Sequence, residues 1–132
     1  MSDEDVISIS QDDYLERILE LIERKGYARI ADLAGDLGVR EPSASTMVKR
    51  LAQAGLVERE AYRGFVLTAA GRKRAEHIQE RHQVLAAFFE TIGVGTETAA
   101  RDIDGIEHYL SDETVAALKR VTRKLMRGAY DK

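Results

Sequence analysis

The 132-residue sequence contains no cysteine and a single proline, and only 6% of its residues are aromatic. Without cysteine the chain can form no disulfide, zinc–thiolate site or iron–sulfur cluster. The low proline content and the scarcity of glycine clusters argue against disorder and against a turn-rich all-β fold. No apolar run approaches the roughly 18 residues of a membrane helix, and the acidic start, "MSDEDVISIS", lacks the features of a signal peptide. We therefore expect a cytoplasmic protein with no membrane association.

Acidic and basic side chains are distributed unevenly along the chain. The net charge is −3, yet residues 40–74 carry eight basic and three acidic side chains and lie between two acidic segments. The last segment, 119–132, is basic again, with six basic residues and one acidic residue. A local basic face can bind a polyanion even when the total charge is negative. This charge distribution is compatible with nucleic acid binding to the basic segment and with cation binding to the acidic segments.

The first part of the sequence predicts three short helices and a β-hairpin. Ser10 and Gly26 are suited to begin and end the first helix, Gly38 ends the second, and Pro42 fits the first turn of the third. The segment "LVEREAYRGFVLTAAG" favours two strands joined at "YRG". The predicted elements span about residues 11–25, 29–37, 42–54 and 57–67. Three helices followed by a hairpin make a winged helix-turn-helix, which we assign to residues 1–70.

The remainder, residues 71–132, predicts an all-helical lobe and makes the whole protein mainly α. A long helix is expected over about residues 69–91, followed by one within "GVGTETAARDIDGIEHYL" and one within "SDETVAALKRVTRKLMRG". In the last helix apolar residues recur every three to four positions, so they can pack internally or against a second subunit. This stripe consists of Val115, Leu118, Val121 and Leu125.

The basic segment contains the helix that a winged helix-turn-helix inserts into the major groove of DNA. Its "PSASTMVKR" offers small hydroxyl side chains for bases and phosphates and two cations for the backbone, and a hairpin-tip arginine can reach phosphate or the minor groove. A solvated polar helix face is the plainer interpretation of the same residues. The predicted contacts to double-stranded DNA are Ser43, Ser45, Thr46, Lys49, Arg50 and Arg63.

The stretch "DIDGIEHYL" mixes acids and a histidine with apolar residues. Asp104, Glu107 and His108 are spaced i, i+3 and i+4, so a helix would place them on one face. Carboxylate oxygens with an imidazole suit manganese, iron(II), cobalt or zinc. Three ligands on one helical turn seldom complete a coordination sphere, so other segments must contribute.

Further acidic and histidine side chains can complete such a site. His82 follows the acidic "QE" of the long helix, and Asp13 and Glu16 repeat the i, i+3 spacing in the first helix. Because Glu20 and Glu23 continue that spacing, the first-helix acids also fit an ordinary solvated face. His82 taken alone equally fits a packed or exposed histidine.

Several other functions fit parts of this pattern. A winged-helix regulator could respond to a small organic ligand, with the acidic cluster as mere surface. A metal-dependent hydrolase could use the carboxylates and histidines to activate water. However, the sequence has no nucleophile motif and no phosphate loop, and neither a hydrolase nor a metal-storage protein would need the winged helix. We therefore expect a protein that is not an enzyme and has no organic cofactor.

From about residue 11 to 118 the chain resembles the diphtheria toxin repressor family of metal-dependent regulators, and within it the manganese transport regulator branch. The resemblance rests on the order of "DDYLERI", "GYARIADLAGDLGV", "PSASTMVKRLAQAGLVERE", "YRGFVLTAAG", "ERHQ", "IGVG" and "GIEHYL". It implies a cytoplasmic homodimeric repressor that binds a palindromic operator and uses Mn(II) as corepressor for manganese uptake genes. Iron(II) is the alternative metal, and the SH3-like third domain of larger members is expected to be absent.

The resemblance also implies a ligand set for two manganese ions per subunit, for which other divalent transition metals can substitute. Iron-sensing relatives carry sulfur ligands at two positions where this chain has hard oxygen donors. The branch usually has glutamate at position 104, and the shorter aspartate leaves open whether one or two ions bind. The implied ligands are Asp13, Glu16, His82, Asp104, Glu107 and His108.

Overall fold

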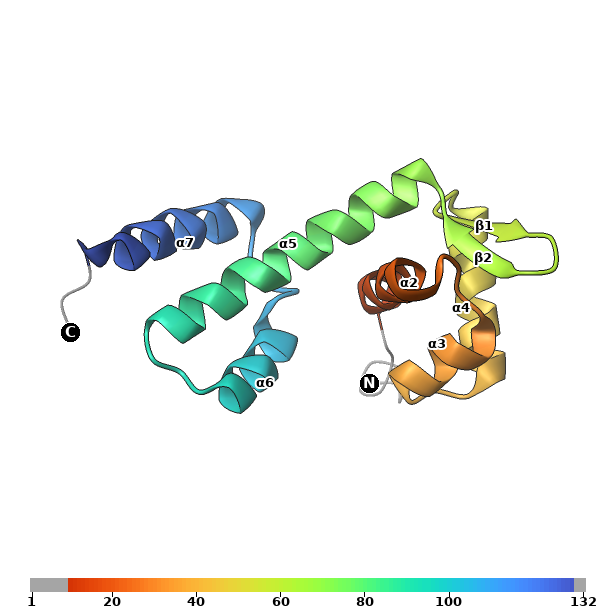
Figure 1. Ribbon diagram of the computed structural model, residues 1–132, viewed down its shortest axis with the longest axis horizontal. Helices are drawn as coiled ribbons and strands as arrows, with labels where there is room; N and C mark the ends of the chain where they lie inside the picture. The colour runs from red at the N-terminus through yellow and green to blue at the C-terminus, as the bar shows by residue number, and fades with distance from the viewer. Residues whose placement is uncertain (1–9, 130–132) are drawn as a thin grey trace. The chain divides into compact units, whose positions relative to one another are not determined.

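The computed structural model describes residues 10–129. It divides into two compact units, one ending at Ile78 and the other beginning at Gln79, so the division falls within helix α5, Ala69–Thr91 (Figure 1). Within the described residues there are six α-helices and one two-stranded hairpin, which confirms the mainly helical class. None of these helices combines the length and apolar character that crossing a membrane requires.

The N-terminal unit is built around α2, Gln11–Lys25, whose ends are those that the sequence predicts. Ser10 caps the helix: its Oγ accepts a hydrogen bond from the Asp13 backbone N–H at 3.1 Å, and its own N–H donates to Asp13 Oδ2 at 3.2 Å. Gly26 ends the helix in the left-handed conformation at φ 88°. The apolar side of α2 supplies much of this unit's core through the fully buried Leu15 and Ile18.

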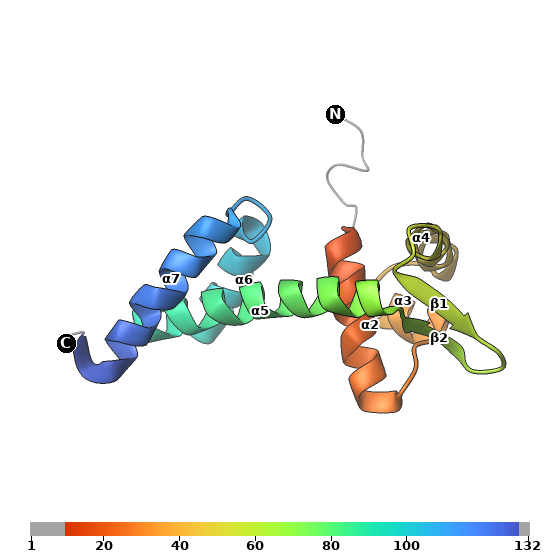
Figure 2. The same ribbon diagram turned by 90° about the horizontal axis from the view of Figure 1, so that it is seen from above.

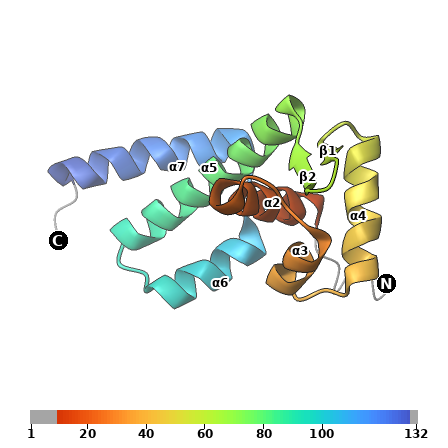
Figure 3. The same ribbon diagram turned by 45° about the vertical axis from the view of Figure 1, so that its right-hand side comes forward.

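Helices α3, Ile30–Leu37, and α4, Glu41–Gln53, form the helix-turn-helix (Figure 3). Gly38, at φ 68°, allows the chain to leave α3, and the proline that follows Glu41 lies in the first turn of α4. One side of α4 is buried in the core through residues spaced three to four apart, so its opposite side faces solvent. The buried residues of α4 are Ala44, Val48 and Leu51.

Strands β1, Val57–Glu60, and β2, Gly64–Leu67, form the predicted hairpin in antiparallel register (Figure 1). The segment between α2 and α3 also pairs with β2, because the N–H of Ala28 donates to the carbonyl of Phe65 at 2.8 Å and the reverse bond has the same length. This close approach requires glycine at position 64, where a Cβ atom would lie 2.2 Å from the Ala28 carbonyl oxygen. The wing is thereby fixed to the helices.

The C-terminal unit contains the later part of α5 together with α6, Thr96–Ile106, and α7, Asp112–Lys124 (Figure 2). Ser111 begins α7 by accepting the Thr114 N–H at 3.1 Å. The chain then continues into a wider turn over Leu125–Ala129, where the glycine at position 128 has φ 86°. Buried apolar side chains from all three helices form the core of this unit: Val84, Leu85, Ala99, Ile103 and Val115.

The predicted apolar stripe of α7 is not buried within the single chain at one position. Val121 is 45% exposed, whereas its neighbour Thr122 is buried. The buried face follows the i, i+3, i+7 positions from Val115, and a threonine can occupy such a position when its hydroxyl is hydrogen-bonded. Here Thr122 Oγ1 donates to the Leu118 carbonyl at 2.7 Å, which satisfies the hydroxyl within the helix.

Candidate metal centre and nucleic-acid interface

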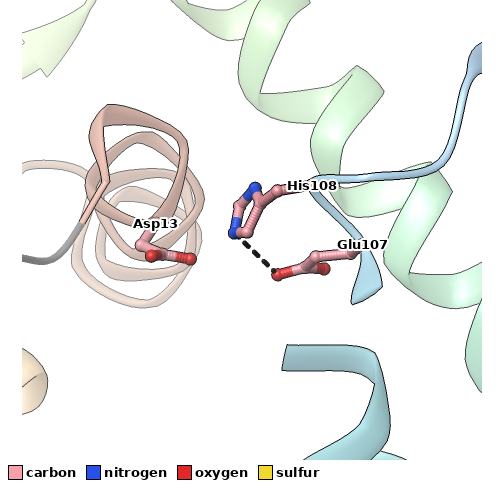
Figure 4. Close-up of side chains that lie close together, drawn as sticks. All are labelled: Asp13, Glu107 and His108. Carbon is pink, nitrogen blue, oxygen red and sulfur yellow. Dashed lines mark ion pairs between the residues drawn. The ribbon is translucent and has the colours of Figure 1, made fainter. Parts of the chain in front are cut away.

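Glu107 is the centre of a polar cluster within the C-terminal unit. Its side chain is only 8% exposed, and each carboxylate oxygen faces a different imidazole. Oε2 lies 3.3 Å from Nδ1 of His82, which α5 contributes, and Oε1 lies 3.6 Å from Nε2 of His108. Figure 4 shows the second of these pairs as a dashed line. The structure therefore brings together three of the six predicted ligands.

The backbone that carries Glu107 and His108 is the end of α6 and the turn toward α7. Glu107 caps α6, and its N–H donates to the Ile103 carbonyl at 2.9 Å. His108 lies beyond the helix, so the prediction that one helical face carries the whole 104–108 group is wrong for this residue. The helix ends because the chain turns at Tyr109, whose N–H bonds to the Ile106 carbonyl, and Ser111 starts a new helix.

Arg81, the residue before His82, holds this turn from α5. One guanidinium nitrogen, Nη2, donates to the carbonyl oxygens of Glu107 at 2.8 Å and of Leu110 at 2.6 Å. The other, Nη1, pairs with Asp112 Oδ1 at 2.7 Å. Sequence reasoning missed this residue, although its position inside "ERHQ", next to a predicted ligand, was a usable signal.

Of the other three predicted ligands, one is on α6 and two are on α2. Asp104 is exposed on α6. Asp13 and Glu16 are half-buried on α2, in the N-terminal unit, and Figure 4 also labels Asp13. Besides accepting the Ser10 N–H, Asp13 Oδ2 accepts the Ser10 hydroxyl at 2.9 Å. Glu20, on the same helix, pairs with Arg17 at 2.9 Å, as a solvated charged surface would.

The chemistry of the cluster suits a divalent cation. A buried carboxylate is costly unless a cation or strong hydrogen bonds compensate its charge. Here the contacts with the two imidazoles, or a bound ion placed between oxygen and nitrogen donors, can supply that compensation. One carboxylate with two imidazoles is a ligand type used for manganese, iron(II), cobalt and zinc.

A second candidate site is the exposed side of α4. Ser43, Thr46, Lys49 and Arg50 are exposed there, while Ser45 is half-buried. The hydroxyl of Thr46 donates to the Pro42 carbonyl at 2.9 Å, so this group faces an incoming partner as an acceptor. Small hydroxyls near the helix start with cations one turn later form a surface that DNA can occupy.

The wing adds positive charge that sequence reasoning identified only in part. Arg63, exposed in the hairpin, places its guanidinium carbon 5.4 Å from the centre of the Tyr27 ring. Arg29 makes a similar contact with the same ring at 5.0 Å. Such cation–π contacts restrict long side chains, so two arginines are held near one another where the wing meets the start of α3. Tyr27 and Arg29 were missed because their proximity to the hairpin depends on the Ala28–Phe65 pairing.

Two family models match the chain, one in each half. Residues 7–65 match the N-terminal DNA binding domain of the iron dependent repressor, and residues 68–128 match the metal binding and dimerisation domain of that repressor. The chain is 46% identical over 113 residues to the transcriptional regulator MntR of Escherichia coli O157:H7, covering 86% of this chain and 73% of that protein. It is also 46% identical over 102 residues to the HTH-type transcriptional regulator MntR of Geobacillus kaustophilus, covering 77% and 72%.

Solved structures show the same fold. The manganese regulator SloR superimposes with a TM-score of 0.77 at 26% identity, covering 89% of this chain and 55% of that one. IdeR of T. acidophilum gives 0.75 at 27% identity, with 96% and 57% covered. The chain thus spans little more than half the length of these solved structures. The predicted winged helix followed by a helical lobe is confirmed, and these relatives are regulators of transcription rather than enzymes.

Proposed function

Because the chain belongs to the iron dependent repressor family, we propose that it is a transcriptional repressor for which Mn(II) is the corepressor. The observation that carries the metal part of the proposal is the buried carboxylate of Glu107, which has one imidazole at each oxygen. The presence of a matched DNA binding domain and a matched dimerisation domain supports a homodimer that binds DNA. Its proposed site of action is the cytoplasm, and its proposed targets are manganese uptake genes.

The proposed ligands are the predicted six, divided between α2 and the C-terminal unit. Since the two oxygens of Glu107 face different histidines, this carboxylate is suited to lie between two ions, one on the His82 side and one on the His108 side. Asp13 and Glu16 are proposed to complete the two sites, and Asp104 to lie close to both. Two ions per subunit is therefore our proposed stoichiometry.

The donor set supports manganese over softer metals. The proposed ligands are four carboxylates and two imidazoles, and the chain has no cysteine that could add a thiolate. Manganese binds most donor sets less tightly than iron, cobalt or zinc, so a regulator must favour it through hard oxygen ligands and geometry. Other divalent transition metals are expected to bind in vitro. Iron(II) is the second candidate corepressor, because the matched models describe iron dependent repressors.

The proposed DNA contacts are the six residues predicted on α4 and in the wing, within a DNA-binding domain of residues 1–70. The metal-binding and dimerisation domain is assigned to residues 71–132. A homodimer would present two α4 helices to a palindromic operator, with half-sites about one DNA turn, roughly 34 Å, apart. Metal shared between ligands of α2 and of the C-terminal domain would reduce the conformational freedom that DNA binding otherwise has to remove.

The test is binding of a labelled operator from a manganese-transporter promoter to the chelated protein and to the protein with added Mn(II), Fe(II) or Zn(II). We expect operator binding to depend on metal. In Glu107→Ala and His108→Ala the metal-dependent binding should be lost, while the circular dichroism spectrum remains that of a helical protein. His77→Ala is the matched control, since it removes an exposed histidine of α5 that is not a proposed ligand. Unchanged metal stimulation in both ligand variants would contradict the metal site, and metal-independent binding would favour an organic effector.

A further inference from the structure

The side chain of Arg81 is largely buried, with only 15% of its surface exposed. An arginine held this firmly on a surface helix needs an explanation, because long charged side chains normally stay in solvent. Its three contacts all go to the short segment that carries the proposed ligands Glu107 and His108: two backbone carbonyls and Asp112.

Of the two carbonyls that Arg81 binds, that of Glu107 lies at the C-cap of α6 and that of Leu110 lies in the turn just before α7. The last carbonyls of a helix have no partner within the helix and must find a donor elsewhere. Glu107 and Leu110 are only three positions apart, and a single nitrogen of Arg81 donates to the carbonyl oxygens of both, at 2.8 and 2.6 Å. Arg81 therefore holds the turn at two carbonyls, one on each side of His108 in the sequence.

Arg81 is also the direct neighbour of His82 on α5. The same helical turn therefore supplies one imidazole to Glu107 and one guanidinium to the Glu107 backbone. The guanidinium fork is rigid and can hold several acceptors at once, which an ammonium group does less well. Its contacts couple the position of the α6–α7 turn to the position of His82.

We propose that Arg81 is a positioning residue for the metal centre: it holds the 107–110 turn so that Glu107 and His108 stay in place opposite His82. The inference rests on the proposed function, since it assigns a role toward those ligands. Groups that orient metal ligands without touching the metal commonly change metal affinity 10- to 100-fold when they are removed.

The experiment titrates the full chain with Mn(II) and follows free Mn(II) by electron paramagnetic resonance. Arg81→Gln is expected to weaken Mn(II) binding by about 10- to 100-fold. Lys119→Gln is the matched control: it removes the same charge and breaks a second ion pair between α5 and α7, Lys119 Nζ to Glu80 Oε1 at 2.6 Å, without changing a contact of the turn. Because that pair is exposed, the control should bind Mn(II) within about twofold of the wild type.

A second readout separates positioning from general stability. The visible absorption of bound Co(II) reports its ligand geometry, and at saturating Co(II) Arg81→Gln should give a spectrum different from that of the wild type and of Lys119→Gln. Unchanged Mn(II) affinity and an unchanged Co(II) spectrum would overturn the inference while leaving the proposed function intact. Absence of Mn(II) binding by the wild type would instead overturn the proposed function, and the inference with it.

Two further variants keep the inference falsifiable if Arg81→Gln fails to fold. Arg81→Lys keeps the charge but cannot reproduce the fork, so we expect intermediate Mn(II) affinity; wild-type affinity in this variant would contradict the proposal. Asp112→Asn leaves both carbonyl contacts in place and removes only the 76%-exposed carboxylate partner. It should bind Mn(II) nearly as the wild type does, and a loss as large as that of Arg81→Gln would assign the effect to the ion pair.

Discussion

Replacing Glu107 by glutamine should abolish the stabilisation that manganese gives to the folded protein. The substitution keeps the size of a side chain that is 8% exposed and lies 3.3 Å from His82 and 3.6 Å from His108, but removes its negative charge. A ligand that binds only the folded state at 100 times its Kd stabilises that state by about 2.7 kcal/mol. For a chain of 132 residues each kcal/mol moves Tm by about 3–5 °C. The wild type should therefore gain roughly 8–13 °C with saturating Mn(II).

The assay is thermal unfolding followed by circular dichroism, with chelator and with excess Mn(II). The free energy of unfolding of the metal-free variant should fall by about 1–3 kcal/mol, because the charged carboxylate that hydrogen-bonds His82 and lies beside His108 has become neutral. The decisive quantity is the increase in Tm on adding Mn(II), which should vanish in Glu107→Gln. Glu97→Gln removes an exposed acid from the first turn of the same helix and should keep the full shift. A full Mn(II) shift in Glu107→Gln would refute the assignment of this carboxylate as a ligand.

Three other perturbations test separate parts of the structure. Arg63→Ala should weaken operator binding and reduce the slope of log K against log salt by about 1, as loss of one phosphate contact predicts; an unchanged slope would remove the wing from the interface. Gly71→Ala should destabilise the protein by at least about 1–3 kcal/mol in urea unfolding, because its Cβ would lie 1.9 Å from the Leu56 carbonyl oxygen. The control Gly35→Ala, with open space around it in α3, should be neutral or stabilising. Equal changes in the free energy of unfolding for the two variants would contradict the close approach of Gly71 to Leu56. Burial raises the pKa of Tyr14 above its ordinary value of 10.0, so folding disfavours its phenolate; the free energy of unfolding should fall as the pH rises above about 10, and Tyr14→Phe should lessen that fall.

Much of the fold could be predicted from local signals. Ser10, Gly26 and Gly38 act at the positions where the sequence places them, because capping and left-handed turns depend on residues close in the chain. The hairpin follows from "YRG" between two apolar segments. Periodicity alone did not show that Thr122 would be buried in the single chain, because its burial depends on a hydroxyl that is hydrogen-bonded within its own helix.

The candidate site was predictable in its residue types and less so in its geometry. The spacing of Glu107 and His108 and the resemblance to a known family identified three side chains that the structure brings together. The turn after α6 could not be predicted, because the donor to its Glu107 and Leu110 carbonyls is Arg81, more than 25 residues earlier in the chain. The contacts of Tyr27 with two arginines were hidden for a similar reason, since they depend on pairing between distant segments.

The most direct test of the central claim is operator affinity measured by fluorescence anisotropy, with Mn(II) buffered at a series of free concentrations. The account predicts tight, specific binding by the wild type only when Mn(II) is present, with the metal response lost in Glu107→Gln and retained in Glu97→Gln. Equal operator affinity in chelator and in Mn(II) would contradict it, and would reduce the His82–Glu107–His108 cluster to a structural ion-pair network.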